Sequence, residues 1–266
     1  MTGYKTQNNM KIDFDPPSSV TLSKVCKKYY LHHAKPTLVE NILHQKNEGF
    51  WALRDITMAI KKGDKVGIVG PNGSGKTTLL KIIAGISSPT SGSIKTRGRL
   101  VSLIDVGAGF HPDLTGVKNI FLNGLLIGMD RKEITRKLKK IVAFSGVGEF
   151  IDLPLFTYSE GMKLRLGMAI AIHADPDVLV LDEGFGVGDQ KFKEKIKRVY
   201  QELFKGKTVI VVSHDMYTII DYCDKVFVMD KGRILYQGSV KSAIKKYKGN
   251  YNSSVKWYIN QKRQNS

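Results

Sequence analysis

The chain has 266 residues, of which 42% are hydrophobic, and this suits one large globular domain or two small ones. No apolar run approaches the roughly 20 residues that a membrane-spanning helix needs, so we expect no spanning segment. The formal net charge of +18 favours an anionic partner, such as nucleic acid, an anionic membrane surface or a phosphorylated substrate, without choosing among them.

Strand-like and helix-like patterns alternate along the chain. We expect a flexible N-terminal tail over residues 1–19, one folded domain over 20–240 and a basic C-terminal extension over 241–266. Apolar runs predict strands at Val20–Leu31, Trp51–Ile60, Lys65–Val69, Val178–Leu181, Thr208–Val212, Lys225–Met229 and Arg233–Tyr236. The 3.6-residue period predicts helices at Lys76–Ala84, Phe192–Phe204 and Met216–Cys223, and a helical block from Pro112 to about Ile172. This alternation favours a mostly parallel sheet in a three-layer α/β arrangement.

A glycine-rich segment follows the short strand predicted at Lys65–Val69. It reads Gly70-Pro71-Asn72-Gly73-Ser74-Gly75-Lys76-Thr77 and fits the pattern G-x-x-x-x-G-K-[ST] in full. Its glycines let backbone N–H groups curl round phosphates, and the N-terminus of the next helix adds partial positive charge. We expect Lys76 to reach the β- and γ-phosphates and the Thr77 hydroxyl to ligate Mg²⁺. A plain glycine-rich turn is the alternative, which the strand before it and the helix after it disfavour.

Two later strands end in residues that suit phosphate hydrolysis. One ends in Asp182, which we expect to hold Mg²⁺ directly or through water, and Glu183, which we expect to polarise the attacking water. The other leads to His214, which we expect to hydrogen-bond the γ-phosphate. The carboxyl ends of parallel strands lie at one edge of a sheet, where such sheets bind ligands. Each ending is common by itself, and the phosphate loop upstream is what favours the functional interpretation.

With these motifs in this order, residues 20–238 resemble the ATP-binding subunit of an ABC transporter. The resemblance implies a P-loop NTPase fold of the ABC type. Its parts would be a mostly parallel core sheet, an antiparallel β subdomain and an α-helical subdomain at about 105–172. It also implies that ATP and Mg²⁺ bind at the phosphate loop, which would extend through Thr78. An upstream aromatic residue would stack on adenine, and Tyr29 is the candidate; Tyr30 is a weaker one, and a plain strand aromatic is the alternative.

The family's signature, usually Leu-Ser-Gly-Gly-Gln, has one candidate here, the segment Tyr158–Met162. Ser159 and Gly161 match, and a serine hydroxyl and a glycine N–H at a helix N-terminus suit a γ-phosphate. The resemblance implies that Ser159, Gly161 and Met162 close over the nucleotide of a second, antiparallel copy. A homodimer with two shared ATP sites follows, in which Asp189 would contact the other subunit.

Departures from the family pattern narrow the class of cargo that the resemblance implies. Met162 replaces the usual glutamine, and Glu160 adds negative charge near a phosphate without an evident reason. The lid glutamine is missing. Asp105 is the nearest polar residue, where a contribution to Mg²⁺ or water and a simple turn residue are open alternatives. The segments Val106–Gly116 and Gly186–Asp189 resemble the branch that exports polysaccharides such as O-antigen, capsule and teichoic acid.

The resemblance therefore implies an ATP hydrolase at the cytoplasmic face of the inner or plasma membrane. It would be held there by two copies of a separate permease and would power export of a lipid-linked polysaccharide. An ABC exporter of another cargo, a drug or a lipid, is the alternative. A DNA-associated ABC ATPase would fit the charge, but the block between the two nucleotide motifs is short and shows no sustained heptads. We expect no nucleic acid partner.

Overall fold

The structure, a computed structural model, describes residues 18–30, 49–104, 109–182, 205–213 and 216–246. The first strand begins at Ser18, within the segment expected as a tail, and the rest of that segment lies outside the described residues. The helix expected at Phe192–Phe204 also lies outside them. Among the described residues, no helix combines the length and the apolarity that crossing a bilayer requires.

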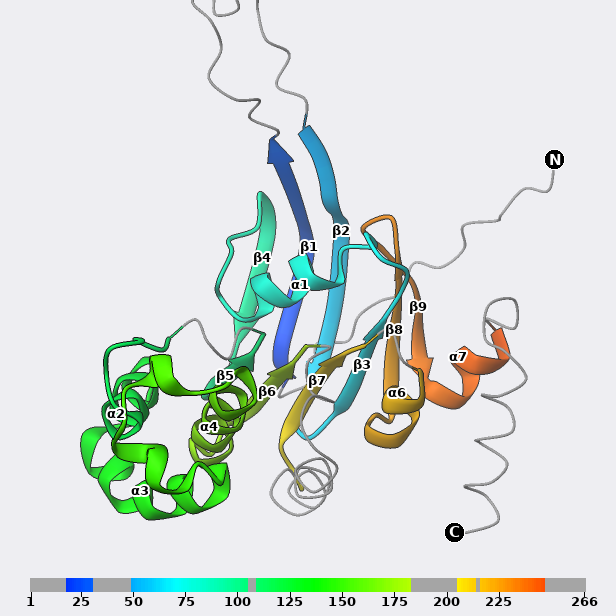
Figure 1. Ribbon diagram of the computed structural model, residues 1–266. Coiled ribbons are helices and arrows are strands. Elements are labelled where there is room, and N and C mark those ends of the chain that lie inside the picture. The colour runs from blue at the N-terminus through cyan, green and yellow to red at the C-terminus, as the bar shows by residue number, and fades with distance from the viewer. Residues whose placement is uncertain (1–17, 31–48, 105–108, 183–204, 214–215, 247–266) are drawn as a thin grey trace, which may run out of the picture.

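Two sheets form the centre of the molecule (Figure 1). A three-stranded antiparallel sheet has the order β2-β1-β4, with β1 at Ser18–Tyr30, β2 at Gly49–Lys61 and β4 at Ser91–Thr96. A six-stranded sheet has the order β5-β6-β7-β3-β8-β9. Its strands are β3 (Lys65–Val69), β5 (Leu100–Leu103), β6 (Val178–Leu181), β7 (Thr208–Val212), β8 (Lys225–Asp230) and β9 (Arg233–Ser239). Only the β8–β9 pair is antiparallel among these described strands, so the predicted fold class is confirmed.

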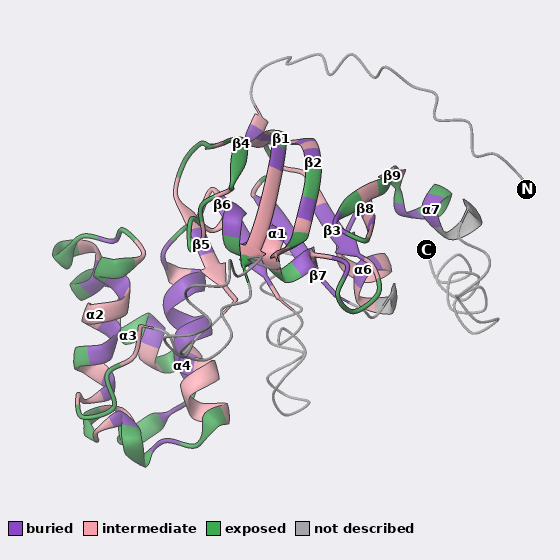
Figure 2. Ribbon diagram, turned by 90° about the horizontal axis from the view of Figure 1, so that it is seen from above, coloured by how far each residue is buried: buried purple, intermediate pink, exposed green. Residues whose placement is uncertain are grey.

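The central strands β6 and β7 of the six-stranded sheet are buried on both faces, which explains why they are continuously apolar. In β6, Val178 and Val180 face the core shared with α1 (Lys76–Ile83) and the antiparallel sheet. Leu179 and Leu181 point the other way, into the core shared with the helical subdomain. Figure 2 shows the purple of buried residues concentrated in these strands and in α4 (Glu160–His173). Two cores on one sheet give the three layers expected from the sequence.

Two strands were missed by the sequence patterns. β4 has a single apolar side chain, Ile94, and is exposed over most of its length, because it pairs only with β1 among the described strands. β5 is a four-residue strand at the sheet edge and shows no clear period. Hydrogen bonding to neighbouring strands, and not apolar periodicity, defines both elements.

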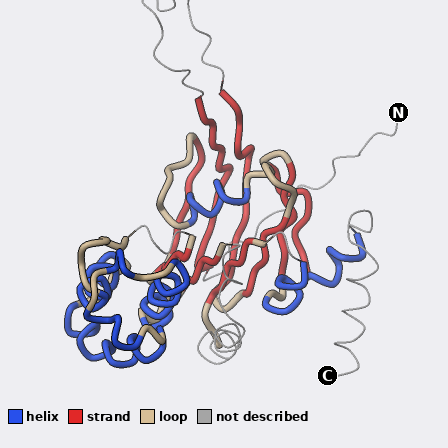
Figure 3. The backbone as a smooth tube through the Cα atoms, in the orientation of Figure 1, coloured by secondary structure: helices blue, strands red, loops and turns tan. Residues whose placement is uncertain are grey.

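The predicted helical block is a group of three α-helices beside the sheets, α2 (Gly116–Leu126), α3 (Arg131–Ser145) and α4 (Figure 3). Each begins at a capping side chain. Thr115 accepts from the N–H of Lys118, Asp130 from that of Glu133 and Ser159 from that of Met162. These caps satisfy N–H groups that a helix start leaves without a partner, which is why the three helices begin where they do.

The first residues of the segment expected as a C-terminal extension form part of a helix, α7 (Val240–Lys246). Helices α6 (Met216–Tyr222) and α7 follow β7 and β9, and α7 packs on the β8–β9 pair. Val240 and Ala243 are buried. The folded part of the described chain therefore extends beyond the expected boundary at residue 240, because two apolar side chains of α7 pack against β8 and β9.

A cluster of charges joins the helical subdomain to the sheet. Glu133 of α3 pairs with Arg99, just before β5, at 3.2 Å, and with Lys137, one turn along α3, at 2.7 Å. The side chain of Glu133 is only 13% exposed. The hydrogen bond from Lys137, more than the one from Arg99, holds the pKa of this carboxyl below its ordinary value of 4.5. Glu133 therefore stabilises the fold in its ionised form.

Replacing Glu133 by Gln should reduce the pH dependence of stability. Because the folded-state pKa is depressed, the contribution of Glu133 is complete above about pH 4.5 and is lost as the pH falls through the folded value. We expect wild type to exceed Glu133→Gln by about 0.5 to 1 kcal/mol in unfolding free energy at neutral pH and by less in acid. Urea unfolding at a series of pH values measures this, with the exposed Glu149→Gln as control. A difference that stays constant with pH would contradict the assignment.

Candidate functional site

The glycine-rich segment Gly70–Gly75 connects β3 to α1, as predicted. Gly73 and Gly75 have positive φ of 77° and 100°, a conformation in which a side chain is strained. A Cβ at Gly75 would also lie 2.5 Å from the carbonyl oxygen of Ala52. The loop therefore needs glycine for two reasons, backbone conformation and the close approach of β2.

Two buried polar side chains inside this loop are suited to phosphate. Lys76 is only 6% exposed, and its Nζ donates to the carbonyl oxygens of Gly70 at 2.8 Å and Pro71 at 3.0 Å. Ser74 is 1% exposed, and within the described chain its Oγ has no hydrogen-bond partner. The first turn of α1 contains no acidic residue. A buried ammonium, a buried hydroxyl without a partner and a helix N-terminus together form a cradle that a polyphosphate fits.

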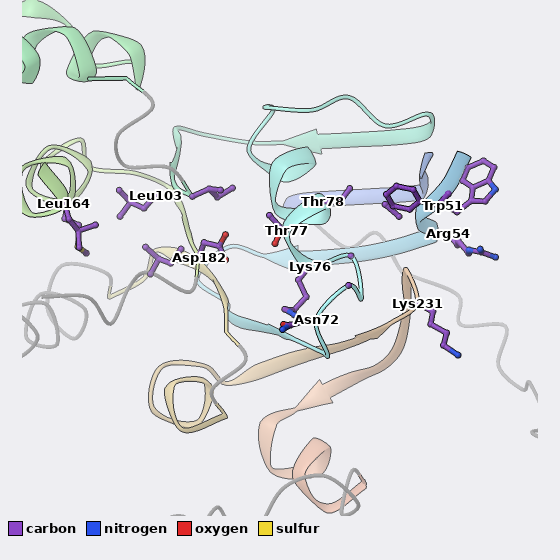
Figure 4. A pocket seen from close by; sticks show the side chains of 17 residues that line it. Trp51, Arg54, Asn72, Lys76, Thr77, Thr78, Leu103, Leu164, Asp182 and Lys231 are labelled. Carbon is purple, nitrogen blue, oxygen red and sulfur yellow. The ribbon is translucent and has the colours of Figure 1, made fainter. Parts of the chain in front are cut away.

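A cavity of about 830 Å³ opens over the loop. Figure 4 shows Lys76, Thr77 and Asn72 near its middle, Asp182 on one side of them and Trp51 on the other. The cavity runs from the carboxyl end of β6 past the phosphate loop to β2. It is lined by Phe50, Trp51, Ala52, Arg54, Asn72, Gly73, Gly75, Lys76, Thr77, Thr78, Leu103, Ile104, Leu164, Met168, Leu181, Asp182 and Lys231.

Thr77 and Asp182 line the same cavity, as predicted for a Mg²⁺ site. Thr77 lies in the first turn of α1, and Asp182 directly follows β6. In the described parts of the chain, no three His, Cys, Asp or Glu side chains gather in a way that would hold a metal ion. One hydroxyl and one carboxylate suit Mg²⁺, which keeps several waters and takes further oxygens from nucleotide phosphates. The residues present therefore fit Mg²⁺ bound together with a nucleotide.

The aromatic wall of the cavity comes from β2 and not from Tyr29. Phe50 and Trp51 line the cavity and are 52% and 39% exposed, whereas Tyr29 is not among the lining residues. Tyr29 is the cross-strand partner of Phe50, and their ring centroids are 5.6 Å apart. The sequence carried a signal for this, two adjacent aromatic residues at the start of β2, but the family pattern pointed to the strand before. Tyr30 is exposed and lies outside the lining residues too.

Two cations of the cavity were not predicted, Arg54 and Lys231. Lys231 lies in the β8–β9 turn, far along the chain from the phosphate loop. The neighbouring Gly232 joins three segments, because its N–H donates to the Ser74 carbonyl at 3.0 Å and its carbonyl accepts from the N–H of Arg54 at 2.8 Å. No local pattern could reveal this contact, since it depends on how β8 and β9 return to the loop.

The signature segment stands at the exposed start of α4. Ser159 caps the helix with its Oγ 3.2 Å from the Met162 nitrogen, and Tyr158 before it is buried, donating to the Phe150 carbonyl at 2.5 Å. Burial, more than the charge of Asp152, raises the pKa of the Tyr158 hydroxyl, which stays a neutral donor. The structure does not bring Ser159 to the cavity of its own chain, whereas Leu164 and Met168 of the same helix reach it. Ser159 is thus a helix cap that faces outward.

Other residues of the signature segment have separate places. Gly161 lies in the first turn of α4, and Met162 is partly buried against the apolar core, so neither lines the cavity. Glu160 pairs with Lys163 at 2.7 Å across one turn, with its side chain 89% exposed. The carboxylate of Glu160 therefore points into solvent beside a lysine, and not toward the cavity of its own chain.

Four predicted site residues lie outside the described residues, namely Glu183, His214, Asp105 and Asp189. The strands that lead to the first two are described. β6 and β7 are neighbours in parallel register, with Leu181 beside Val211, and β7 pairs in turn with β3, which leads to the phosphate loop. The carboxyl ends of these three strands lie at one edge of the sheet. From that edge the chain continues to Glu183, to His214 and to the phosphate loop.

Comparison with known proteins identifies the family. The model of the ABC transporter family matches residues 53–186, half of the chain. The chain belongs to the ABC transporter family. A solved structure of the ATP-binding cassette MJ0796, a post-hydrolysis dimer bound to ADP and Pi, has a TM-score of 0.67 and 24% identity, covering 83% of this chain and 98% of that one. Its likeness shows that this ABC family member has the same fold.

Two curated relatives carry the names of polysaccharide export systems. The O-antigen export system ATP-binding protein RfbB of Myxococcus xanthus is 46% identical over 198 residues, covering 74% of this chain and 45% of the relative. The teichoic acids export ATP-binding protein TagH of Listeria innocua is 37% identical over 246 residues, covering 91% of this chain and 72% of the relative. The chain thus spans less than half of the first relative. The predicted resemblance to the polysaccharide-exporting branch is confirmed.

Proposed function

We propose that this chain binds and hydrolyses MgATP as the ATP-binding subunit of a transporter that exports a lipid-linked polysaccharide. The single observation that carries the proposal is the order of groups along the cavity. An aromatic wall at Phe50 and Trp51 suits the base, the loop with Lys76 suits the phosphates, and Thr77 with Asp182 suits Mg²⁺.

The chain's own residues account for the steps of hydrolysis. Lys76 and the loop N–H groups hold the phosphates and offset their charge, which grows at the oxygens as the terminal bond breaks. Mg²⁺, when bound beside Thr77 and Asp182, neutralises further charge on the phosphates. Glu183 accepts the proton of the attacking water, and His214 donates a hydrogen bond at the γ-phosphate.

Two copies of the chain complete each site in this proposal. The exposed N-terminus of α4, with Ser159 and Gly161, offers N–H groups and a hydroxyl to the γ-phosphate of the opposite copy. The outward direction of Ser159 supports a contact with another molecule, since its own cavity lies elsewhere. Asp189 contacts the partner copy. Met162 packs against the apolar core and so helps to hold the first turn of α4 in place.

A separate permease, in two copies, holds the dimer at the cytoplasmic face of the membrane. The helical subdomain carries several large apolar side chains exposed to solvent, which a protein contact could bury. They are Leu125, Leu126, Phe150, Leu153 and Phe156. We assign this surface to the cytoplasmic helices of the permease. The excess positive charge of the chain suits an anionic leaflet and a diphosphate-linked lipid cargo.

Replacing Lys76 by Ala in the native organism tests the proposal. Loss of the buried ammonium should abolish ATP hydrolysis, so the polysaccharide should be made but not exported, and its lipid-linked form should accumulate inside the cell. Surface labelling and extraction of lipid-linked glycans measure both pools. Lys81→Ala, an exposed lysine on the same helix, is the matched control. Normal surface polysaccharide with Lys76→Ala, or accumulation of another lipid or drug, would contradict the assigned cargo.

A further inference from the structure

The turn at residues 174–177 joins two elements that carry opposite parts of the proposed site. Before it, α4 runs from the exposed cap at Ser159 to His173. After it, β6 runs to Asp182 at the cavity. The angle at this turn therefore sets where Ser159 lies relative to Asp182.

Arg99 binds both ends of this turn. Its Nη1 donates to the carbonyl oxygen of Ala174 and pairs with Glu133 at 3.2 Å. Its backbone N–H donates to the carboxylate of Asp177 at 2.8 Å, and its carbonyl accepts from the N–H groups of Asp177 at 2.9 Å and Val178 at 3.1 Å. The main chain of Arg99 is thus hydrogen-bonded to the start of β6, and its side chain is hydrogen-bonded to the end of α4.

Glu133 holds the guanidinium in place and recruits a second cation. Lys137, bound to the same carboxylate, donates to the carbonyl oxygen of His173 at 2.8 Å. The carbonyls of His173 and Ala174, at the C-terminal end of α4, each therefore receive a cationic donor, which complements the negative end of the helix dipole.

The other side of the turn is bound from the next strand. Lys207, just before β7, pairs with Asp175 at 2.9 Å, and the N–H of Thr208 donates to the Asp177 carbonyl at 3.0 Å. Asp175 has a positive φ of 51°, a left-handed conformation that Asp adopts more readily than most other non-glycine residues. Since β5 and β7 flank β6, both neighbours of that strand hold the turn, and they do so through the residues that precede them.

We propose that Arg99, oriented by Glu133, is a positioning residue for ATP hydrolysis. It fixes the C-terminal end of α4 on the sheet, so that Ser159 at the other end is held at the angle that closes the partner's site. α4 has 14 residues. It is thus about 21 Å long, and a tilt of roughly 10° at Arg99 moves Ser159 by about 4 Å, more than a hydrogen-bond length. This inference rests on the shared sites of the proposed function.

Arg99→Met, which keeps the aliphatic stem, tests the inference in the full chain. We expect kcat for ATP hydrolysis to fall at least about tenfold, because small displacements of reacting groups have large effects. In a Glu183→Gln background, the dissociation constant of the MgATP-dependent dimer should rise by a similar factor. Binding of MgATP by dilute single chains should stay within about twofold of wild type, because Arg99 is not among the cavity's lining residues. Arg99→Lys should restore part of the activity.

Matched variants keep the result interpretable. Lys225→Met removes an ion pair with Asp64, at 2.7 Å, that also lies at strand starts in the same sheet, and it should leave hydrolysis and dimerisation unchanged. Glu133→Gln should have the same effect on hydrolysis and dimerisation as Arg99→Met. It can therefore replace Arg99→Met in the test if Arg99→Met fails to fold.

Three outcomes are distinct. Wild-type hydrolysis and dimerisation in both Arg99→Met and Glu133→Gln would overturn the inference and leave the proposed function standing. Single-chain MgATP binding that falls in parallel with hydrolysis would overturn it as well, since Arg99 would then support the nucleotide cavity. A fully active Ser159→Arg protein would instead overturn the shared sites on which the inference rests.

Discussion

Replacing Glu183 by Gln should lower the rate of ATP hydrolysis by about 10² to 10⁴-fold, the range that general bases contribute. Gln keeps the size and polarity of the side chain but cannot accept the proton of the attacking water. MgATP binding should persist, because the loop residues and Asp182 that would hold the nucleotide and Mg²⁺ are unchanged. The protein should therefore accumulate as a dimer with bound MgATP, which size-exclusion chromatography and nucleotide analysis detect.

Asp182→Asn separates the base from the metal ligand. This variant alters the carboxylate that lines the cavity, so it should weaken the Mg²⁺ dependence of nucleotide binding. Glu183→Gln should leave that dependence intact. Hydrolysis at the wild-type rate in Glu183→Gln would show that Glu183 is not the base. Another residue at the same sheet edge would then have to accept the proton.

Replacing Ser159 by Arg should abolish hydrolysis while single chains still bind MgATP. The substitution places a large cation at the exposed start of α4 and removes the capping hydrogen bond to Met162. Loss of a cap costs about 1 kcal/mol, which alone leaves the fold intact. Asp130→Arg, which removes the equivalent cap of α3 on an exposed residue, controls for capping and added charge. Hydrolysis and nucleotide binding are measured on both variants.

A mixture of two inactive proteins makes the test of sharing direct. Ser159→Arg keeps an intact phosphate loop, and Lys76→Ala keeps an intact signature segment. A mixed dimer would combine the good halves into one complete site. If the sites act independently, an equal mixture should recover about a quarter of wild-type activity, because about half of the dimers are mixed and each has one good site. A mixture that stays inactive would argue that both halves of a site belong to one chain.

The features of the cavity that could be inferred from the sequence are local in the chain. The phosphate loop from Gly70 to Thr77 is defined by consecutive residues, and its strand and helix follow from short-range patterns. Asp182 directly follows a four-residue buried strand, so its place at the cavity could be inferred from that strand alone. Ser159, expected at the N-terminus of a helix, stands there and accepts a hydrogen bond from the N–H of Met162.

The parts that were missed depend on contacts between distant segments. Lys231 reaches the cavity because Gly232 hydrogen-bonds both the phosphate loop and β2. The aromatic wall came from Phe50 and Trp51 because β2, and not the end of β1, passes beside the loop. Strand β4 was missed because its single apolar residue gives no period.

The sequence by itself determined the fold class, the family and the glycine-rich loop between β3 and α1, because each depends on residues adjacent in the chain or on a repeating apolar period. Only the tertiary structure decided which aromatic residues and cations face the cavity and how Arg99 holds the end of α4. These are contacts of side chains across strands and turns, and the geometry that creates them exists only once the two sheets and the helical subdomain have packed together.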